Sequence, residues 1–343
     1  MLPSTDSRQA SGPNAMETLF DLAGAQRGKV VHRAALLAEL LKPIDDKMKH
    51  TNKRVTKIEE APSGQVVIHF SDNSTHTVDA VIGADGVRGF VRAHVLGADH
   101  PAVNAKPAGL WDCRALLPMA KAKELLGEQY FEEDRQYGFI GDGGFFMHDV
   151  LDSGETVQCV FSIPTDASWG ENEWTRKIER ADLEKAVEHW TDTPLKKGVV
   201  EAMLQNPDLK AFVQHHHSVD APTYAKGRVC IMGDAAHCAT PWQGSGAGQA
   251  IEDAMVLETL LGDVKDASQL ANALQAYSDV RIERTQRVIH SSIGTAQLMI
   301  GRGEGVGLDV DKVREAMPPR WGFIYGLDLA EHKNEALAKF RAM

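Results

Sequence analysis

Two predicted strands in this sequence each end at an aspartate, and strand ends of this kind can bind ligands. Thr77–Ile82 is followed closely by Asp85, and the apolar run Val229–Met232 leads directly into Gly233 and Asp234. Near-continuous apolar runs are typical of strands buried on both faces, and open α/β sheets bind ligands beyond the carboxyl ends of such strands. Carboxylates there can accept hydrogen bonds from ligand hydroxyls, such as those of a ribose or ribityl chain. One Asp-Gly pair alone is more often a plain turn, and the repetition favours a binding site.

A glycine-rich loop follows the second strand end and leads into a predicted helix. Pro241 lies early in the loop, and Gly246 and Gly248 lie where the helix is expected to begin. The free N–H groups and the positive dipole end of a helix N-terminus stabilise an anion or a developing negative charge. Such a loop alone could equally be a flexible connector, but the order of strand, Gly-Asp, Pro, glycine loop and helix is specific. One face of this helix is expected to carry Ala250, Ala254, Leu257 and Leu261.

The order of the predicted elements places a β-rich segment between two α/β segments. Residues 109–164 alternate short β-like runs with Gly and Asp turns, which is typical of a mostly antiparallel sheet. Asp182–Asn206 predicts two helices that are divided near Thr193 and Pro194. An insertion between two pieces of one ligand-binding domain explains this order better than two consecutive domains. The expected parts are a disordered lead-in (1–15), the first part of the binding domain (16–105), the inserted sheet (106–222) and the second part with C-terminal helices (223–343).

The composition limits the partners and the location of the protein. With 37 basic and 48 acidic residues, the 343-residue chain has a formal charge of −11, which argues against nucleic-acid and anionic-membrane binding. Its 4 cysteines form no C-x-x-C pair and are too few for a disulfide scaffold. The N-terminus has no apolar segment typical of a secretory signal, and no run approaches the roughly 18 apolar residues that span a bilayer. We therefore expect a cytoplasmic protein with reduced thiols.

Several segments resemble those of one family in the expected order. Gly227–Ala254 closely resembles the Gly-Asp motif of the single-component flavoprotein hydroxylases, especially the salicylate hydroxylase group, and Val81–Arg92 resembles their Asp-Gly motif. Val31–Leu37 resembles their Val-His-Arg-x-x-Leu segment, and Arg114–Pro118 and Tyr277–Arg284 match weaker patterns. The resemblance covers nearly the whole chain. It implies an α/β fold: an FAD-binding, Rossmann-like domain of the GR2 type with an inserted, mostly antiparallel substrate sheet and C-terminal helices.

The resemblance also implies roles around the flavin ring. Asp234 would bind the ribityl chain of FAD, and Pro241 would pack near the reactive edge of the isoalloxazine. His237 would either orient the glycine-rich loop or line the active site, and it joins Pro241 as a catalytic candidate. Trp242 is a further candidate for contact with an aromatic substrate or the flavin, because of its place in the loop and not because of the resemblance. The main chain of the motif would bind the cofactor through Gly233, Gly244, Ser245, Gly246 and Ala247.

At the nucleotide end of FAD, the resemblance assigns three further residues. Asp85 and Arg92 would lie near the ribose and pyrophosphate and support the nicotinamide step. Arg33 would reach the phosphates, since a guanidinium is a permanently charged, forked donor. Two departures stand out: Gly89 occupies a position where the family usually has Ser, and no Gly-x-Gly-x-x-Gly segment precedes Val31. We therefore expect an N-terminally truncated, incomplete Rossmann-like domain that binds FAD weakly or not at all.

Other chemistry-bearing residues favour plainer interpretations. His215–His217 cannot all face one metal ion if they lie in a strand, because side chains alternate between faces, so no metal site is expected. Arg281, Arg284 and Arg287 form a helical stripe for which solvation or packing against the nucleotide domain outweighs phosphate binding.

The function implied by the resemblance is an oxidoreductase. NAD(P)H would reduce FAD, molecular oxygen would be activated on the flavin, and a hydroxyl group would be transferred to a small aromatic acid or phenol of the salicylate type. One alternative is a truncated, catalytically impaired homologue that binds FAD poorly and has an interaction role or none. Another is a flavoenzyme that modifies a larger metabolite with the same motifs. The substrate, the nicotinamide preference and the oligomeric state stay open.

Overall fold

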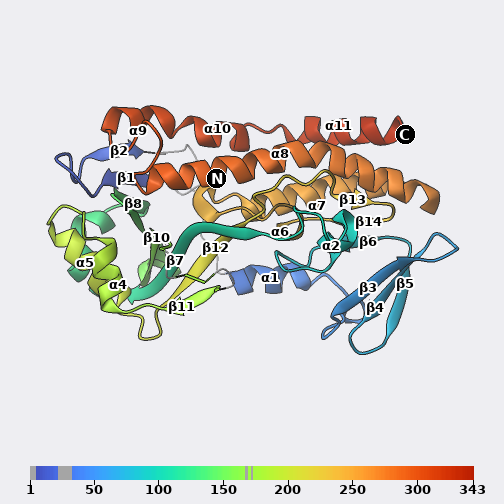
Figure 1. Cartoon of the computed structure of the whole chain (residues 1–343), viewed down its shortest axis with the longest axis horizontal. Coiled ribbons are helices and arrows are strands. Elements are labelled where there is room, and N and C mark those ends of the chain that lie inside the picture. Colours follow the sequence, from blue (N-terminus) through green and yellow to red (C-terminus); the bar gives the residue numbers. More distant parts are fainter. Residues whose placement is uncertain (1–4, 22–32, 167–168, 171–172) are drawn as a thin grey trace. The chain divides into compact units, whose positions relative to one another are not determined.

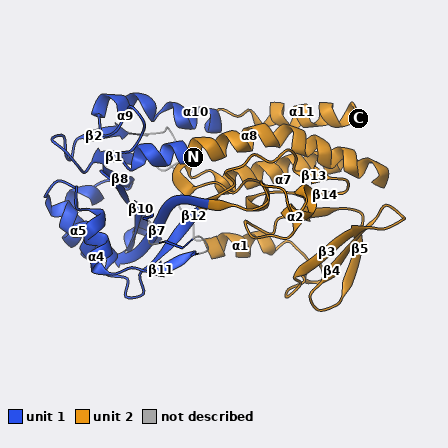
Figure 2. Ribbon diagram, viewed as in Figure 1, with its two compact units in different colours: residues 1–30, 107–214, 292–325 blue, residues 31–106, 215–291, 326–343 orange. Residues whose placement is uncertain are grey.

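The computed structural model describes residues 5–21, 33–166, 169–170 and 173–343 (Figure 1). The chain divides into two compact units, coloured separately in Figure 2. We call residues 1–30, 107–214 and 292–325 the sheet unit, and residues 31–106, 215–291 and 326–343 the motif unit, since both aspartate motifs lie in the latter. Each unit therefore combines segments that are far apart in the sequence.

The sheet unit is built on an eight-stranded sheet of order β11-β12-β7-β10-β9-β8-β1-β2. The pairs β7–β10, β10–β9, β9–β8, β1–β2 and β11–β12 are antiparallel, whereas β1 and β8 are parallel. The mostly antiparallel character predicted for this region is thus observed. The strands are β1 (Thr5–Gln9), β2 (Thr18–Asp21), β7 (Lys106–Pro118), β8 (Gln136–Gly141), β9 (Gly144–Leu151), β10 (Thr156–Pro164), β11 (Thr175–Lys177) and β12 (Lys210–His216).

The expected disordered lead-in is wrong for the residues that the structure describes. Thr5–Gln9 forms β1, which pairs in parallel with Gln136–Ile140 of β8, and its side chains are mostly buried. The Oγ1 atom of Thr5 donates a 2.9 Å hydrogen bond to Gln136. Main-chain pairing with a distant strand therefore orders a segment whose polar sequence gave no strand signal.

Helices cover one face of this sheet and enclose the apolar core of the unit. α5 begins at Pro194, and the Oγ1 atom of Thr193 accepts a hydrogen bond from the amide of Lys196, which confirms the predicted division between two helices. The core contains alternate residues of β7 (Trp111, Cys113, Ala115 and Leu117). The helices are α3 (Met119–Leu126), η2 (Glu128–Phe131), η3 (Asp152–Gly154), α4 (Arg180–Ala186), α5 (Pro194–Met203), α9 (Val310–Ala316) and α10 (Pro319–Tyr325).

The motif unit contains two small sheets, of order β13-β14-β6 and β3-β4-β5. Thr77–Ile82 was predicted as one strand, and this prediction is wrong. The chain leaves the second sheet after Val78 and enters the first at Val81, because β5 pairs antiparallel with β4 while β6 pairs in parallel with β14. The strands are β3 (Val55–Glu60), β4 (Val66–Phe70), β5 (Thr75–Val78), β6 (Val81–Gly83), β13 (Ala225–Lys226) and β14 (Val229–Ile231).

The helices of the motif unit differ strongly in burial. α7 and α8 contribute to its apolar core, whereas no residue of α1 is buried, and Leu36, Leu37, Leu40 and Leu41 are all exposed. Ile82 is also exposed on β6, the outer strand of its sheet. The helices are α1 (Arg33–Leu41), η1 (Asp46–Met48), α2 (Val91–Leu96), α6 (Asp234–His237), η4 (Pro241–Gln243), α7 (Gly246–Asp263), η5 (Ala267–Gln269), α8 (Leu270–Met299) and α11 (Leu329–Arg341).

The division into units departs from the expected parts in three places. Residues 16–21 belong to the sheet unit instead of the first binding part, and 215–222 belong to the motif unit instead of the inserted sheet. We expected 223–343 to form a single part, but 292–325 belongs to the sheet unit. The reason is the length of α8, whose 30 residues extend over about 45 Å at 1.5 Å per residue, so that its two ends lie in different units.

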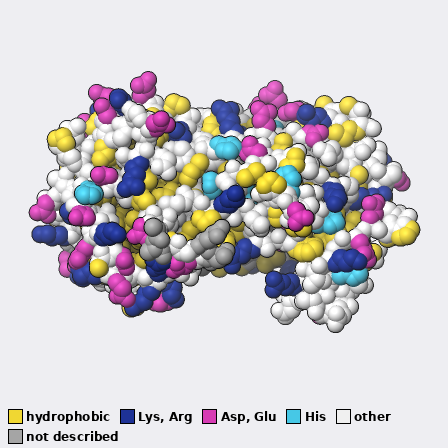
Figure 3. All heavy atoms as spheres, in the orientation of Figure 1, with side chains coloured by type: hydrophobic (Ala, Val, Ile, Leu, Met, Phe, Trp, Pro, Cys, Tyr) yellow, Lys and Arg dark blue, Asp and Glu magenta, His cyan; other side chains and the backbone are white. Residues whose placement is uncertain are grey.

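Charged side chains of both signs are interspersed with apolar ones on the face of the molecule shown in Figure 3. None of the helices in the described ranges is both long and apolar enough to span a membrane.

Candidate functional site

Parallel pairing brings the two aspartate motifs to one edge of a sheet. Ile231 of β14 lies opposite Gly83 of β6, and the amide of Met232 donates a 3.0 Å hydrogen bond to the carbonyl of Gly83. Asp85 and Asp234 therefore follow strands that end side by side. This is the arrangement in which open α/β sheets bind ligands.

The turn after β14 requires glycine. Gly233 has φ 59° and ψ −144°, a conformation that is strained for any residue with a Cβ atom. Its carbonyl accepts hydrogen bonds of 2.9 Å from the amides of Ala236 and His237, which closes the short helix α6 directly after the strand. The turn places Asp234 at the first position of this helix.

The carboxylate of Asp234 is available for a ligand. The residue is exposed, whereas Ala235, Ala236 and His237 in the same helix are buried. No hydrogen bond or ion pair links its side chain to the rest of the described chain. An exposed acceptor at the end of a buried strand is suited to bind ligand hydroxyl groups.

The glycine-rich loop leaves the first turn of α7 uncovered. η4 ends at Gly244, which is left-handed with φ 59° and ψ 21°, and α7 begins at Gly246. The side chain of Ser245 makes no capping hydrogen bond, and a Cβ atom added at Gly246 or Gly248 would meet nothing within 4 Å. Residues 246–248 are exposed, so the first turn of the helix is accessible, and its positive dipole end favours a negatively charged group.

A buried carboxylate lies behind both elements. The Oδ2 atom of Asp253 on α7 accepts hydrogen bonds from the amide of Gly233 at 2.9 Å and from Nε2 of His237 at 2.6 Å. Its Oδ1 atom accepts a 2.7 Å bond from Nε of Arg281 on α8. Both Asp253 and Arg281 are fully buried, so this ion pair is shielded from water and salt.

Arg281 also contacts further residues of α7, and its Nη1 atom lies 3.2 Å from Nε2 of His332 on α11. It donates to Glu252 at 2.6 Å and to the carbonyl and side-chain oxygens of Gln249 at 3.1 and 2.9 Å. Burial opposes the ionisation of Asp253, but the bonds to His237 and Arg281 outweigh it and keep the pKa of Asp253 below its ordinary value. The pKa of Glu252 is lowered in the same way, because two guanidinium groups outweigh its burial.

Asp85 caps a helix instead of standing free. Its Oδ2 atom accepts a 3.0 Å hydrogen bond from the amide of Val91, the first residue of α2. The residue is nevertheless exposed, so its remaining acceptor sites are open to a ligand. A Cβ atom on Gly89 would collide with the carboxylate of Asp85. The glycine at this position, where the family usually has serine, makes room for the cap.

Arg92 lies inside the protein and not at its surface. Its side chain is buried, Nε donates to the carbonyl of Ala102 at 2.8 Å, and Nη1 donates to Ala235 and Ala236 at 2.9 and 2.5 Å. Burial lowers its pKa to about 10. Arg92 therefore braces two carbonyl groups within α6, and its predicted place near the ribose and pyrophosphate stays a prediction.

Two loop residues are less accessible than the sequence suggested. His237 is buried and bonded to Asp253, which favours the loop-orienting interpretation, and its catalytic role stays a prediction. Trp242, which we expected to contact a ligand, is buried as well. Pro241, the other catalytic candidate, is exposed at the start of η4, and its catalytic role stays a prediction.

Arg33 is the exposed first residue of α1, and nothing in the structure tests its phosphate role. Val31 and His32, which precede it, lie outside the described residues.

Asp253 was not among the residues predicted from the sequence, and Arg281 was expected to lie in a solvated or packing stripe. The predicted apolar face of α7 was also wrong in part, since Ala254 is exposed, and the buried residues are Gln249, Asp253, Val256, Leu257 and Leu260. This buried set contains a carboxylate at helical spacing from three aliphatic residues. A carboxylate on the apolar face of a helix is the signal that could have identified Asp253. Carboxylates are rarely fully buried without a partner, so its position predicts a buried cation or donor beside it.

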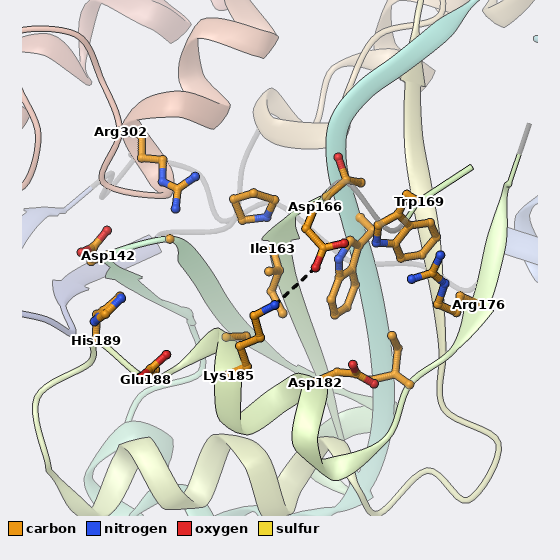
Figure 4. Close-up of a pocket in the computed structure, with 16 residues that line it drawn as sticks. Asp142, Ile163, Asp166, Trp169, Arg176, Asp182, Lys185, Glu188, His189 and Arg302 are labelled. Atoms are coloured by element: carbon orange, nitrogen blue, oxygen red, sulfur yellow. Dashed lines mark hydrogen bonds and ion pairs between the residues drawn. The ribbon is translucent and has the colours of Figure 1, made fainter. Parts of the chain in front are cut away.

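A pocket of about 320 Å³ lies within the sheet unit (Figure 4). Trp111 and Trp169 form part of its wall with ring centres 6.2 Å apart, and the guanidinium of Arg176 lies 4.2 Å from the ring of Trp169. Lys185 pairs with Asp166 at 3.4 Å across the pocket. The lining carries both signs of charge, so its electrostatics favour neither an anion nor a cation.

A buried polar cluster lies on the other face of the sheet from the apolar core. Asp112 lies between Trp111 and Cys113, which both belong to that core, and therefore points to the opposite face. Its Oδ1 atom accepts hydrogen bonds from Ser162 at 2.5 Å and from Gln214 at 2.6 Å. Burial raises the pKa of Asp112, and the two hydrogen bonds oppose that shift only in part. Sequence analysis gave no signal for this cluster.

Two of the three consecutive histidines contact Cys238. Nδ1 of His217 accepts a 3.1 Å bond from the amide of Cys238, and the carbonyl of His215 accepts from the thiol of the same cysteine. Within the described ranges no group of three metal-ligating side chains comes together.

The hydrogen-bond donors and acceptors at the edge of the β13-β14-β6 sheet fit a flavin. A polyhydroxylated chain needs an exposed acceptor, which Asp234 supplies, and an electron-accepting ring needs main-chain donors, which the first turn of α7 supplies. The open space above Gly246 and Gly248 allows close approach to the main chain.

Comparison with known proteins agrees with this chemistry. A sequence profile described as "FAD binding domain" matches residues 47–292. A 6-methylsalicylate 1-monooxygenase from Aspergillus terreus is 36% identical over 333 residues, which cover 96% of this chain and 73% of that protein. A salicylate hydroxylase from Pseudomonas putida is 30% identical over 324 residues, covering 90% of this chain and 72% of the relative.

Solved structures show the same fold. A salicylate hydroxylase substrate complex superposes with a TM-score of 0.84 at 25% identity, over 97% of this chain and 81% of that one. The Klebsiella pneumoniae protein HpxO, complexed with FAD and uric acid, gives a TM-score of 0.75 at 25% identity, over 98% of this chain and 80% of that one.

Proposed function

Because the chain belongs to the family of FAD-dependent aromatic hydroxylases, we propose that it uses FAD, NAD(P)H and molecular oxygen to hydroxylate a small aromatic acid or phenol of the salicylate type. The relatives with salicylate and 6-methylsalicylate in their names support this substrate class. The observation that carries the proposal is the exposed, unpaired carboxylate of Asp234 beside the uncovered first turn of α7.

FAD, when bound, supplies the redox and oxygen chemistry, and the protein supplies binding and electrostatics. In this proposal Asp234 accepts hydrogen bonds from the ribityl hydroxyls. The amides of Gly246 and Ala247 donate to the ring, and the helix end that carries them stabilises negative charge there. Asp85 keeps an open acceptor for the nucleotide half, and Arg33 is the residue assigned to the phosphates.

On the substrate side we assign Asp112 to a polar group of the aromatic ring. Ser162 and Gln214 both donate to Oδ1, so Oδ2 has no hydrogen bond among the residues described. Asp112→Asn is expected to raise the KM for the aromatic substrate several-fold while the Kd for FAD stays unchanged. Asp149→Asn, another buried carboxylate of the same sheet, is the matched control and is expected to leave KM unchanged. Equal KM values for wild type and Asp112→Asn would contradict the assignment.

The direct test is reconstitution with FAD. The purified protein is titrated with FAD by flavin fluorescence, and oxidation of NADH and NADPH is followed with salicylate and with 6-methylsalicylate, with the product identified by chromatography. We expect FAD binding that is weak, because no Gly-x-Gly-x-x-Gly segment is present, but saturable, together with substrate-stimulated oxidation and a hydroxylated product. Asp234→Ala is expected to weaken FAD binding, whereas Asp263→Asn at the other end of α7 is not. Absence of FAD binding at saturating cofactor would support the alternative of an impaired homologue and overturn the proposal.

A further inference from the structure

We propose that Asp253, held by Arg281, is the positioning residue that fixes the Gly233–His237 segment, and with it the carboxylate of Asp234, in the geometry that binds the flavin. This inference rests on the proposed function, because it concerns the same site. It adds residues that do not touch the cofactor themselves and act through the ones that do.

α6 is held from the inside at both ends. The amide of Gly233, directly before the helix, donates to Oδ2 of Asp253 at 2.9 Å, and the ring of His237, its last residue, bonds to the same atom at 2.6 Å. A carboxylate can only accept, so Nε2 of His237 carries the hydrogen. Arg92 binds the carbonyls of Ala235 and Ala236. Asp234 is thus the one exposed member of a helix whose other residues are buried.

The contact to Gly233 matters because glycine is conformationally permissive and does not fix the turn by itself. A main chain with φ 59° and ψ −144° is one of many conformations open to glycine, so the surroundings must select it. The bond from Asp253 to the amide of Gly233 is one of the contacts that do so. Without it, the turn can adopt other conformations and rotate Asp234, the next residue along the chain, away from its position.

Arg281 stabilises the ionised form of Asp253 and connects this residue to the start of α7 after the glycine-rich loop. Removing Arg281 would leave Asp253 as an uncompensated charge in a fully buried site, which is costly. Its guanidinium also donates to the carbonyl and the side chain of Gln249, in the first turn of α7. One ion pair therefore fixes both the Asp234 segment and the accessible first turn of α7.

A purely structural ion pair would make different predictions. Its loss would lower the stability of the fold without a selective effect on FAD. The positioning role predicts that FAD affinity falls in a variant that is still folded, and that substrate KM, measured at saturating FAD, does not change. Asp253→Asn preserves the shape of the side chain but places an NH₂ group against the donors of Gly233, His237 or Arg281.

The experiment compares FAD dissociation constants for wild type, Asp253→Asn, Arg281→Lys and His237→Gln by fluorescence titration. The control is Asp263→Asn, which removes an exposed ion pair with Arg341 at the far end of α7. Asp253→Asn is expected to weaken FAD binding tenfold or more, and Arg281→Lys, which keeps the charge but loses the fork, by an intermediate factor. Asp263→Asn is expected to stay within twofold of wild type. Circular dichroism and urea denaturation verify that each variant is folded.

Hydrogen exchange of residues 233–238 in the FAD-free protein gives a second readout, and faster exchange is expected in Asp253→Asn. A folded Asp253→Asn variant with wild-type FAD affinity would overturn the inference and leave the proposed function intact. If Asp253→Asn does not fold, the same criterion applies to Arg281→Lys and His237→Gln. A wild-type protein that binds no FAD would overturn the proposed function. The exchange rates then decide the inference, and unchanged rates in the variant would reject it.

Discussion

The side chain of Asp85 occupies the space that a Cβ atom on Gly89 would need, and from there it accepts a hydrogen bond from the amide of Val91. Gly89→Ala is therefore expected to displace the carboxylate and remove the cap of α2. Loss of such a cap costs about 1 kcal/mol of unfolding free energy, which urea denaturation measures. Asp85→Ala is expected to cost a similar amount. The double variant should cost no more than either single change, and an additive loss would contradict this explanation.

The positive φ of Gly233 predicts a large effect from a small substitution. Gly233→Ala is expected to destabilise the protein by about 1–3 kcal/mol, because a residue with a Cβ atom strongly disfavours φ 59° with ψ −144°. Space is not the reason, since the added atom would lie 3.5 Å from Cβ of Ala250, an ordinary contact. Gly262→Ala is the matched control within α7. It meets nothing within 4 Å and is expected to stabilise the helix by up to about 1 kcal/mol. Equal effects of both substitutions would contradict the strain.

Asp149 is expected to make the protein less stable as the pH rises. Burial raises its pKa to about 6, although Gln136 donates to both oxygens. The folded state therefore binds this proton more tightly than the unfolded state, whose pKa is about 3.9. The stabilising contribution is complete below about pH 4 and is lost as the pH rises through about 6. Asp149→Asn is expected to gain on the order of 2 kcal/mol over wild type at pH 8 and nothing at pH 4, in urea denaturation at a series of pH values.

The neighbouring His148 acts in the opposite direction and must be tested separately. Burial lowers its pKa to about 3, and neither ring nitrogen has a hydrogen-bond partner in the described part of the chain. The folded state favours the neutral imidazole. The contribution of His148 to the free energy of unfolding is therefore complete above about pH 6.5 and is lost as the pH falls towards 3. His148→Leu removes this acid sensitivity. If the two effects cancel, the unfolding free energy of the wild type is nearly independent of pH, while those of the two single variants change with pH in opposite directions. If the difference in unfolding free energy between Asp149→Asn and wild type does not change with pH, the Asp149 prediction is rejected.

The cysteines are expected to be unreactive in the folded protein. All four are buried, and burial raises the pKa of Cys159, Cys230 and Cys238 to about 12 and that of Cys113 further still. The thiolate is the reactive form, so little of it exists at pH 8. Titration with a thiol reagent should give slow reaction in the native state and four rapid equivalents after unfolding. One rapidly reacting thiol in the native protein would contradict this.

Local signals in the sequence were sufficient for the elements that carry the site. The apolar run before Gly233 predicted β14, the glycines after Pro241 predicted the start of α7, and Pro194 predicted the division between α4 and α5. Each of these depends on a residue with a strong conformational preference of its own, so the neighbouring sequence is enough to identify it.

The failures concern pairing and burial, which depend on distant residues. β1 is ordered by β8, more than 120 positions away, and the division at Val78 and Val81 depends on two different partner strands. Arg92 is buried, and two of the carbonyl groups that bind it lie more than 140 residues further along the chain. Sequence spacing alone contains no information on such partners.

The outer strand β6 has a consequence for handling the protein. Its main-chain groups on one side have no partner strand among the described residues, Ile82 is exposed on it, and the leucines of α1 in the same unit are exposed as well. An open edge with apolar side chains is a template on which an extended segment of another molecule can add by backbone hydrogen bonds, whatever its sequence. Intermolecular addition grows with concentration whereas folding does not, so the yield of refolded monomer should fall as the protein is made more concentrated.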